Sequence, residues 1–182
     1  MDKKYRLTEE TINVNGRTLH RIEAIKDFSD VKKGEKGGYV EKESNLSQSG
    51  DCWAYDNAKI YDDAQVYDNA SIFDNAEVYG YAVVSCDAKV YDEANVFGRA
   101  LVFDNAEVCG YAEVSDSAIV YDNAQVFSNA EVYDNAQVYG NAVVFGDAEV
   151  FGHAEVFGYA KVFGYAEVSG KAKVRDDMMV YD

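Results

Sequence analysis

A six-residue period runs through most of this chain. From Ala58 to Ala172 an alanine recurs at every sixth position, in 20 consecutive units. Two residues after each alanine stands a valine or an isoleucine, and Val180 follows Met178 in the same way, so the pattern holds at 21 of 21 positions from Ile60 to Val180. An α-helix turns every 3.6 residues and cannot keep a six-residue pattern on one face. The period therefore excludes helix and predicts a repeat architecture.

Each repeat unit predicts a short strand followed by a corner. The unit reads Ala-x-Val-aromatic-Asp/Gly-Asn, as in residues 64–69 and 136–141. Alanine and valine lie two residues apart, so both point to one side of a strand and the residue between them points away. Asp, Gly and Asn tolerate left-handed backbone and form turns. Three units then close one coil, and the coils stack through parallel hydrogen bonds.

Written from its valine, the unit V-Y-D-N-A-Q resembles the hexapeptide repeat of left-handed parallel β-helices, aliphatic-x-x-x-small-x. The resemblance covers residues 46–182. It implies an all-β fold and a left-handed coil. We therefore expect a single parallel β-helix of about seven or eight coils, which at ~4.8 Å per coil is roughly 36 Å long.

Residues 1–45 lack the repeat and predict a separate N-terminal cap. The segment Ile12–Leu19 reads as a β-hairpin with Asn15-Gly16 as its type I′ turn. A cap here would cover the open hydrogen-bonding edge of the first coil. Residues 26–60 also look like the segment that leads into the helix in small hexapeptide proteins of bacterial prophages.

The charge of the chain narrows the choice of partners. It carries 33 acidic and 17 basic residues, a formal net charge of −16. Nucleic acids and anionic membranes bind basic surfaces, so neither is expected as a direct partner. Residues 51–182 hold 24 acidic and 7 basic residues. Over the expected length this is one net charge per ~2.1 Å, close to the ~1.7 Å of duplex DNA. The sequence therefore allows electrostatic imitation of a nucleic acid.

Outward residues that lie 18 positions apart are expected to stack in columns. One column places glutamates on successive coils, and we expect this acidic column to bind a cationic partner. The alternative is a solvated face that tolerates its charge through side-chain splay and counterions. The acidic column consists of Glu77, Glu113, Glu131, Glu149 and Glu167.

A second column carries apolar residues on three successive coils, with aromatic residues beside them. Contiguous exposed apolar surface usually marks an interface, so this apolar patch predicts self-association or a protein partner. The alternative is that single apolar residues are tolerated on a strand surface. The apolar patch consists of Val83, Leu101, Ile119, Phe103, Tyr121 and Tyr139.

The repeat runs to Val180 without a visible cap, so the C-terminal edge formed by Met178, Met179 and Val180 is a further expected contact. The alternative is that the charges of Asp176, Asp177 and Asp182 protect this edge. Together with the apolar patch it predicts a homo-oligomer, either a dimer or a trimer.

The aromatic residues after each valine predict stacked ladders with a structural role. A platform for carbohydrates or bases is the alternative. Asp56, Asp74 and Asp92 are expected at the same corner of successive coils, so a calcium-binding site is one interpretation of these residues. Asx turns explain these aspartates equally, and the nonapeptide signature of calcium-binding rolls is absent.

Many proteins with this repeat are acyltransferases that use acetyl-CoA or acyl carrier protein. They generally carry a loop extruded from the coil and a histidine that acts as general base. Here no loop interrupts residues 58–180, and the histidines are His20, in the cap, and His153, at a corner. Two distant histidines cannot form a zinc site, and no nucleotide-binding motif occurs. We therefore expect no catalytic, cofactor-binding or metal-binding residue.

The first residues contain no signal-like apolar run, and the three cysteines form no CxxC pair, so a cytoplasmic location is expected. The leading hypothesis is a non-catalytic acidic protein that occupies the cationic nucleic-acid-binding site of a host defence protein, as an anti-CRISPR inhibitor would. One alternative is a structural, self-assembling module. The other is a hexapeptide acyltransferase.

Overall fold

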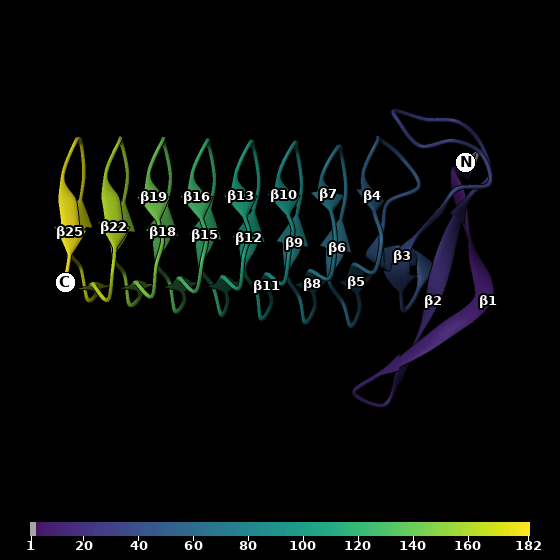
Figure 1. The fold of residues 1–182 in the computed structure, drawn as a ribbon, viewed down its shortest axis with the longest axis horizontal. Helices are drawn as coiled ribbons and strands as arrows, with labels where there is room; N and C mark the ends of the chain where they lie inside the picture. The colour runs from purple at the N-terminus through teal and green to yellow at the C-terminus, as the bar shows by residue number, and fades with distance from the viewer. Residues whose placement is uncertain (1–2) are drawn as a thin grey trace.

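The coils stack along one axis in the computed structural model, which describes residues 3–182 (Figure 1). Within these residues the strands form three sheets of 10, 8 and 7 strands, and each sheet is one wall of the coil. Strands 18 residues apart pair in parallel and in register, as in Leu101 with Ile119. The predicted all-β parallel β-helix is confirmed, with about eight coils.

The ten-stranded sheet contains the cap strands and one wall of the coils. Its strands are β1 (Tyr5–Val14), β2 (Arg17–Ala24), β3 (Lys36–Val40), β5 (Lys59–Ile60), β8 (Glu77–Val78), β11 (Asn95–Val96), β14 (Glu113–Val114), β17 (Glu131–Val132), β20 (Glu149–Val150) and β23 (Glu167–Val168).

The other two walls consist of short parallel strands alone. The seven-stranded sheet contains β6 (Gln65–Val66), β9 (Val83–Val84), β12 (Leu101–Val102), β15 (Ile119–Val120), β18 (Gln137–Val138), β21 (Glu155–Val156) and β24 (Lys173–Val174). The eight-stranded sheet contains β4 (Trp53–Ala54), β7 (Ser71–Ile72), β10 (Lys89–Val90), β13 (Glu107–Val108), β16 (Gln125–Val126), β19 (Val143–Val144), β22 (Lys161–Phe163) and β25 (Met179–Tyr181).

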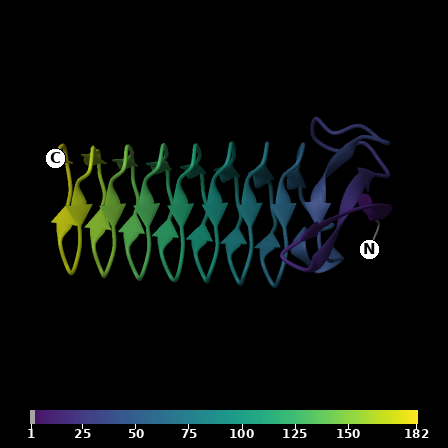
Figure 2. The same cartoon turned by 60° about the horizontal axis from the view of Figure 1, so that its bottom comes forward.

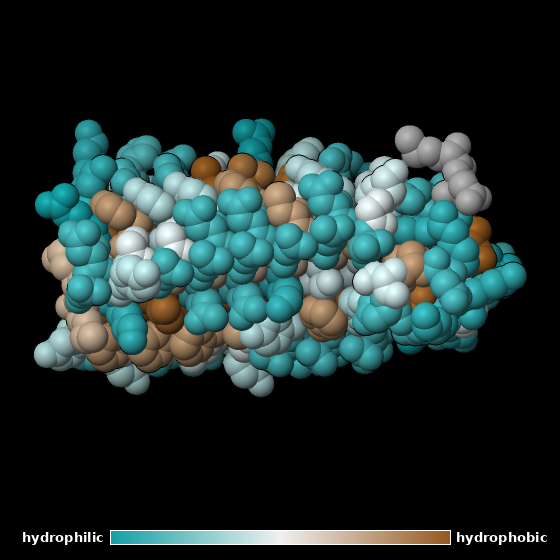
Figure 3. All heavy atoms as spheres, turned by 90° about the horizontal axis from the view of Figure 1, so that it is seen from above, coloured by the Kyte–Doolittle hydropathy of each residue, from teal (hydrophilic) through white to brown (hydrophobic). Residues whose placement is uncertain are grey.

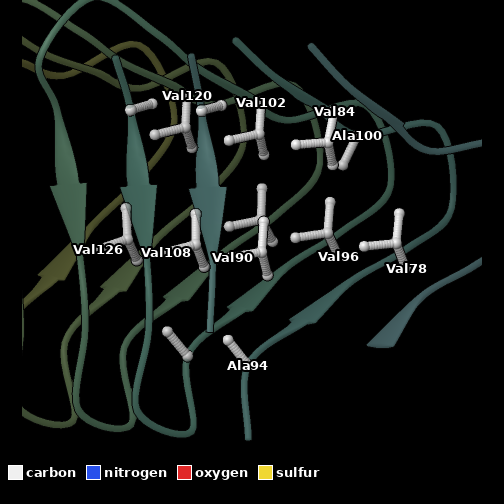
Figure 4. Packing of buried hydrophobic residues seen from close by; sticks show 14 of the residues in the cluster. Val78, Val84, Val90, Ala94, Val96, Ala100, Val102, Val108, Val120 and Val126 are labelled. Atoms are coloured by element: carbon white, nitrogen blue, oxygen red, sulfur yellow. The ribbon is translucent and has the colours of Figure 1, made fainter. Parts of the chain in front are cut away.

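The repeat places its alanines and valines in one continuous core. Every repeat alanine from Ala58 to Ala160 and every repeat Val or Ile from Ile60 to Val162 is at most 1% exposed. Valines from all three walls point into the same interior (Figure 4). Because a strand alternates sides, this burial leaves the residue between Ala and Val on the outer surface of each wall.

The corners use left-handed backbone, as the repeat predicts. The corner residue of each unit has a positive φ, and it is mostly aspartate or glycine, as at Asp92 (60°) and Gly158 (72°). Cys86 (58°) and Ser128 (64°) adopt the same backbone at the equivalent position. Aspartate and glycine are among the residues that reach this region at low cost. The corner therefore explains why Asp and Gly alternate there without any change in the coil.

The N-terminal cap contains the predicted hairpin. Strands β1 and β2 pair in antiparallel fashion, and Asn15 and Gly16 both have positive φ, as a type I′ turn requires. The hairpin lies at the end of the stack of coils (Figure 2). Strand β3 then pairs antiparallel with β2 and parallel with β5. Parallel stacking thus begins at Tyr39 rather than at Leu46, because β3 belongs to both the cap and the first wall.

Trp53 anchors the cap to the first coil. Its ring is fully buried and meets the rings of Tyr5 and Phe28 edge-on, at 6.0 and 5.4 Å between centroids. A Cβ atom on Gly37 would lie 2.6 Å from the Trp53 ring, so this approach requires glycine. The 3-10 helix η1 (Glu43–Asn45) follows β3, and Leu46 then bridges to Val66 in parallel. The cap and the coil therefore share one core.

Candidate functional site

The acidic column lies on the outer side of the ten-stranded sheet. Glu113, Glu131, Glu149 and Glu167 are consecutive in-register neighbours, each paired with the next along the sheet. We call these residues the four-glutamate run. Glu131 and Glu167 are exposed, and Glu113 and Glu149 are half-buried. Four carboxylates therefore face solvent at the spacing of neighbouring strands, about 4.8 Å.

Glu77 lies apart from this run. Asn95 separates it from Glu113, and its carboxylate accepts hydrogen bonds from Lys59 Nζ at 2.7 Å and from the Tyr61 hydroxyl at 2.8 Å. Glu77 is thus neutralised by a neighbouring coil. Sequence reasoning grouped it with the other glutamates because the column alone does not show which charges are paired.

No lysine or arginine within residues 3–182 forms an ion pair with the four-glutamate run. Burial raises the pKa of Glu131, and the carboxylates of Glu113 and Glu149 on either side raise it further. Glu149 accepts a hydrogen bond from the Tyr133 hydroxyl at 2.8 Å, which leaves its charge in place. The run therefore carries uncompensated negative charge.

The apolar patch lies on the outer side of the seven-stranded sheet. Val83, Leu101 and Ile119 are paired in register on β9, β12 and β15. Beside them Phe103 stacks on Tyr121 at 5.2 Å, and Tyr121 stacks on Tyr139 at 4.9 Å. All six side chains are half-buried in the single chain. The structure thus brings the predicted residues into one contiguous surface.

The outer side of the eight-stranded sheet is mixed in character. Lys89 forms an ion pair with Glu107 on the next coil at 3.2 Å. Val143 stands alone between Gln125 and Lys161. Figure 3 shows one side of the whole molecule, on which hydrophilic side chains cover most of the surface and apolar side chains gather along part of one edge. The outward column of this wall therefore shows neither a run of charge nor a run of apolar residues. Beside the column, a ladder of stacked rings consists of Phe127, Phe145, Phe163 and Tyr181.

The corner aspartates form a hydrogen-bonded ladder between coils. The Asp74 carboxylate accepts the backbone N–H of Asp92 at 3.4 Å, and the Asp92 carboxylate accepts that of Gly110 at 3.0 Å. These carboxylates bond to the next coil rather than to their own turn. Within residues 3–182 no group of three His, Cys, Asp or Glu side chains could hold a metal ion.

The two histidines lie far apart in the fold. His20 is on β2, where its Nδ1 lies 3.1 Å from the backbone oxygen of Thr8. His153 is exposed at a corner that has the same length as its neighbours. No loop is extruded between residues 58 and 180 in the structure.

Sequence reasoning missed one buried polar pair in the cap. Lys4 is 1% exposed, and its Nζ donates to the backbone oxygens of Cys52 and Gly50 at 2.8 and 3.0 Å and lies 3.3 Å from Cys52 Sγ. Burial lowers the pKa of Lys4 and raises that of Cys52. Lys4 lies outside the repeat, so no pattern in the sequence points to this contact.

The C-terminal edge is exposed on the last described coil. Met178 and Met179 are 49% and 60% exposed, and Val180 is half-buried. Strand β25 pairs with β22 on one side. No helix among residues 3–182 is long and apolar enough to cross a membrane.

Comparison with known proteins finds a related repeat. Residues 136–152 match the family model of the YdcK β-solenoid repeat. The chain is also 41% identical over 66 residues to a protein of Escherichia coli strain K12 named "Uncharacterized acetyltransferase YdcK". That alignment covers 32% of this chain and 20% of the relative, so the chain spans about a fifth of the relative's length. The chain is therefore a hexapeptide-repeat parallel β-helix that carries a repeat of the YdcK β-solenoid type.

Proposed function

We propose that this protein is a non-catalytic binding module whose four-glutamate run docks on a cationic surface of a partner protein. The observation that carries the proposal is that no lysine or arginine among the described residues, 3–182, forms an ion pair with the run. Elsewhere on the coils, Lys59, Lys89 and Lys173 each neutralise a glutamate on a neighbouring coil. The run, by contrast, keeps its charges on four consecutive coils.

Electrostatics favours such a partner. Like charges directly opposite one another on neighbouring strands destabilise a sheet. A row of lysines or arginines from a partner would remove this repulsion and form new ion pairs at the same time. Association between such surfaces is fast and weakens as salt concentration rises. The proposed complex should therefore be salt-sensitive.

The charge density of the coils favours a nucleic-acid-binding partner. Residues 51–182 carry a net charge of −17, from 7 basic and 24 acidic residues. With one net charge per ~2 Å along the axis of the coils, this charge density approaches that of duplex DNA. In its most specific form, the proposal is that the protein inhibits a host defence protein, such as a CRISPR effector, by occupying its nucleic-acid-binding site.

The test starts with capture from a bacterial lysate on the tagged protein, elution in a salt gradient, and identification of the released proteins. A released nucleic-acid-binding protein is then purified, and its binding to labelled duplex DNA is titrated with this protein. We expect displacement of the DNA. No displacement of the DNA at low salt, or direct binding of the partner with the same dissociation constant at low and high salt, would contradict the proposal.

A matched pair of variants shows whether the run is the binding surface. Glu113, Glu131 and Glu149 are changed to Gln in one variant. In the control, the same number of charges is removed away from the run, by changing Asp87 to Asn, Glu107 to Gln and Asp177 to Asn. We expect the first variant to lose at least about tenfold in affinity, since close charge pairs at interfaces are worth more than 1 kcal/mol each. Equal losses in both variants would mean that net charge, not the run, drives binding.

A second candidate function comes from the related protein, whose name includes acetyltransferase. Here the test is binding of acetyl-CoA by calorimetry, with the His153→Ala variant as a comparison. His153 is the one histidine on the coils, so it is the residue to test as a general base. Acetyl-CoA binding that His153→Ala leaves intact, together with acetyl transfer that it abolishes, would favour this candidate over the binding module.

A further inference from the structure

The outer surface of the seven-stranded sheet has a composition unlike the rest of the coils. Its outward residues on five consecutive coils are Gln65, Val83, Leu101, Ile119 and Gln137, paired in register. None of these five residues carries a charge, although residues 51–182 have a net charge of −17. Two copies of so acidic a rod repel each other. This uncharged strip is where two copies can approach without bringing like charges together.

The order of residues in the strip reads alike in both directions. Leu101 is at the centre, Val83 and Ile119 flank it, and Gln65 and Gln137 lie at the two ends. A two-fold axis that lies in the interface, along strand β12, would place Leu101 opposite Leu101 of the second copy. The same axis would place Val83 opposite Ile119 and Gln65 opposite Gln137. Such an isologous contact requires a self-complementary surface, and the symmetric order of the strip provides one.

The ring column beside the strip fits the same axis. Phe103 would face Phe103 of the second copy, and Tyr67 would face Tyr139. Ser85, where the ladder lacks a ring, would face Tyr121, so a small residue meets a large one. Small residues opposite large ones allow two surfaces to interdigitate. The symmetry thus extends from the strip to its neighbouring column.

The opposite arrangement, with the two rods parallel, is less favourable. It would align each coil with the same coil of the second copy. Glu155 would then face Glu155, and Lys173 would face Lys173, next to the apolar patch. Like charges directly opposite one another are destabilising. The antiparallel arrangement avoids both contacts because it places coils of different sequence together.

We infer that two copies of this chain associate face to face and antiparallel through the apolar patch, with Leu101 at the two-fold axis. The six residues of the apolar patch are already half-buried in the single chain, so they leave little area to bury, whereas standard interfaces bury about 800 Å² per partner. The dimer is therefore expected to dissociate in the micromolar range. This surface is on a different wall from the four-glutamate run, so the dimer leaves the run free and is independent of the proposed function.

The first test measures molar mass against concentration. Sedimentation equilibrium from about 1 to about 500 μM should show a monomer–dimer equilibrium. Leu101→Gln should weaken the dimer at least about tenfold, because it buries a polar group at the centre of the interface. Gln and Glu occupy the equivalent position on other coils, so this variant should fold. Val143→Gln, an apolar outward residue on the eight-stranded sheet, is the matched control and should have no effect.

The second test reads out the orientation. In a background with Cys86→Ser and Cys109→Ser, Val83→Cys and Ile119→Cys are made separately, one of them with a mass tag. Facing sheets lie about 10 Å apart, so a short bismaleimide is used rather than a disulfide. The antiparallel dimer predicts cross-linking only when the two variants are mixed. A monomer at every concentration, a Leu101→Gln dimer as tight as the original, or cross-linking of either variant with itself would each overturn the inference.

Discussion

At the scale of single residues, the corner aspartates do two things at once. Asp92 adopts left-handed backbone, and its carboxylate accepts the N–H of Gly110 on the next coil. Glycine satisfies only the first requirement, whereas aspartate and asparagine satisfy both. This explains why Asp is so frequent at a position where Gly is also allowed.

Variants of Asp92 should separate these two contributions. Asp92→Asn keeps an acceptor and tolerates the backbone, so we expect a change within about 0.5 kcal/mol in the free energy of unfolding. Asp92→Gly removes the hydrogen bond alone and should cost about 0.5–1.5 kcal/mol. Asp92→Ala loses the same hydrogen bond and adds about 1–2 kcal/mol of backbone strain. Urea denaturation measures all three, and an alanine variant as stable as the asparagine variant would refute this account.

Glu131 should destabilise the fold at neutral pH. Its pKa is raised above the usual 4.5 by burial and by Glu113 and Glu149. Just above pH 4.5 the folded state therefore binds more protons at Glu131 than the unfolded state does. The free energy of unfolding falls as the pH rises through this window. Glu131→Gln should raise the melting temperature at pH 7, by removing like-charge contacts worth about 0.2–1 kcal/mol each. The gain should vanish below pH 4.

Glu155 provides the control for this prediction. Its pKa is lowered, first by the hydrogen bond from Lys173. Its charged form is therefore favoured in the folded state, and stability from this group is present above its usual pKa and lost as pH falls. Glu155→Gln should not raise the melting temperature at pH 7. A stabilisation equal to that of Glu131→Gln would show that overall charge, not the local column, sets the effect.

At the scale of elements, the aromatic ladders hold neighbouring coils together from outside the core. On the eight-stranded sheet, Phe145 stacks between Phe127 and Phe163 at 5.1 and 5.0 Å. Each strand of this sheet is only two or three residues long, so the rings supply contacts that the short strands cannot. Ser115 shows that one ring can be missing from a ladder without a break in the coil.

Removing a ring from the middle of a ladder should destabilise the coil measurably. Phe145→Ser breaks two stacked pairs and should cost about 1–3 kcal/mol, at ~0.5–1.5 kcal/mol per pair. Tyr165→Ser is the control, because Tyr165 is 73% exposed and no ring contact is found for it among residues 3–182. Thermal unfolding followed by circular dichroism compares the two. Equal melting temperatures would mean that the ladders add little to stability.

At the scale of the whole molecule, the apolar contacts that stabilise the rod and the charges that repel one another lie in different places. One core runs through the cap and the coils, whereas the negative charge lies on the walls and corners. Salt screens exposed charges, with a Debye length of about 30 Å at 0.01 M and about 3 Å at 1 M. Repulsion between coils should therefore weaken strongly as salt is added.

We expect the melting temperature to rise by a few degrees between about 0.01 and 0.5 M sodium chloride, because screening relieves self-repulsion. Differential scanning calorimetry measures the shift. A variant in which all of Glu113, Glu131, Glu149 and Glu167 are changed to Gln should show a smaller shift. A melting temperature that falls with added salt would indicate that ion pairs such as Lys59–Glu77 outweigh the repulsion.

The sequence by itself determined the coil and the direction of each side chain within it. The spacing is unbroken from Ala58 to Val180, and side chains alternate between the two sides of a strand. In a coil of 18 residues this decides for each residue whether its side chain points into the core or away from it. The columns followed from the same spacing, which is why the stacking order of the acidic column and of the apolar patch could be predicted residue by residue. The type I′ turn at Asn15-Gly16 was equally local.

Only the tertiary structure decided what depends on contacts between segments without a shared period. It placed β3 in both the cap and the first wall, buried Lys4 beside Cys52, and packed Trp53 under the cap. It also showed that Lys59 neutralises Glu77, whereas Glu131 forms no ion pair with a lysine or arginine in the described part of the chain. Column order shows which residues are neighbours, but side-chain reach and burial decide which of them bind each other.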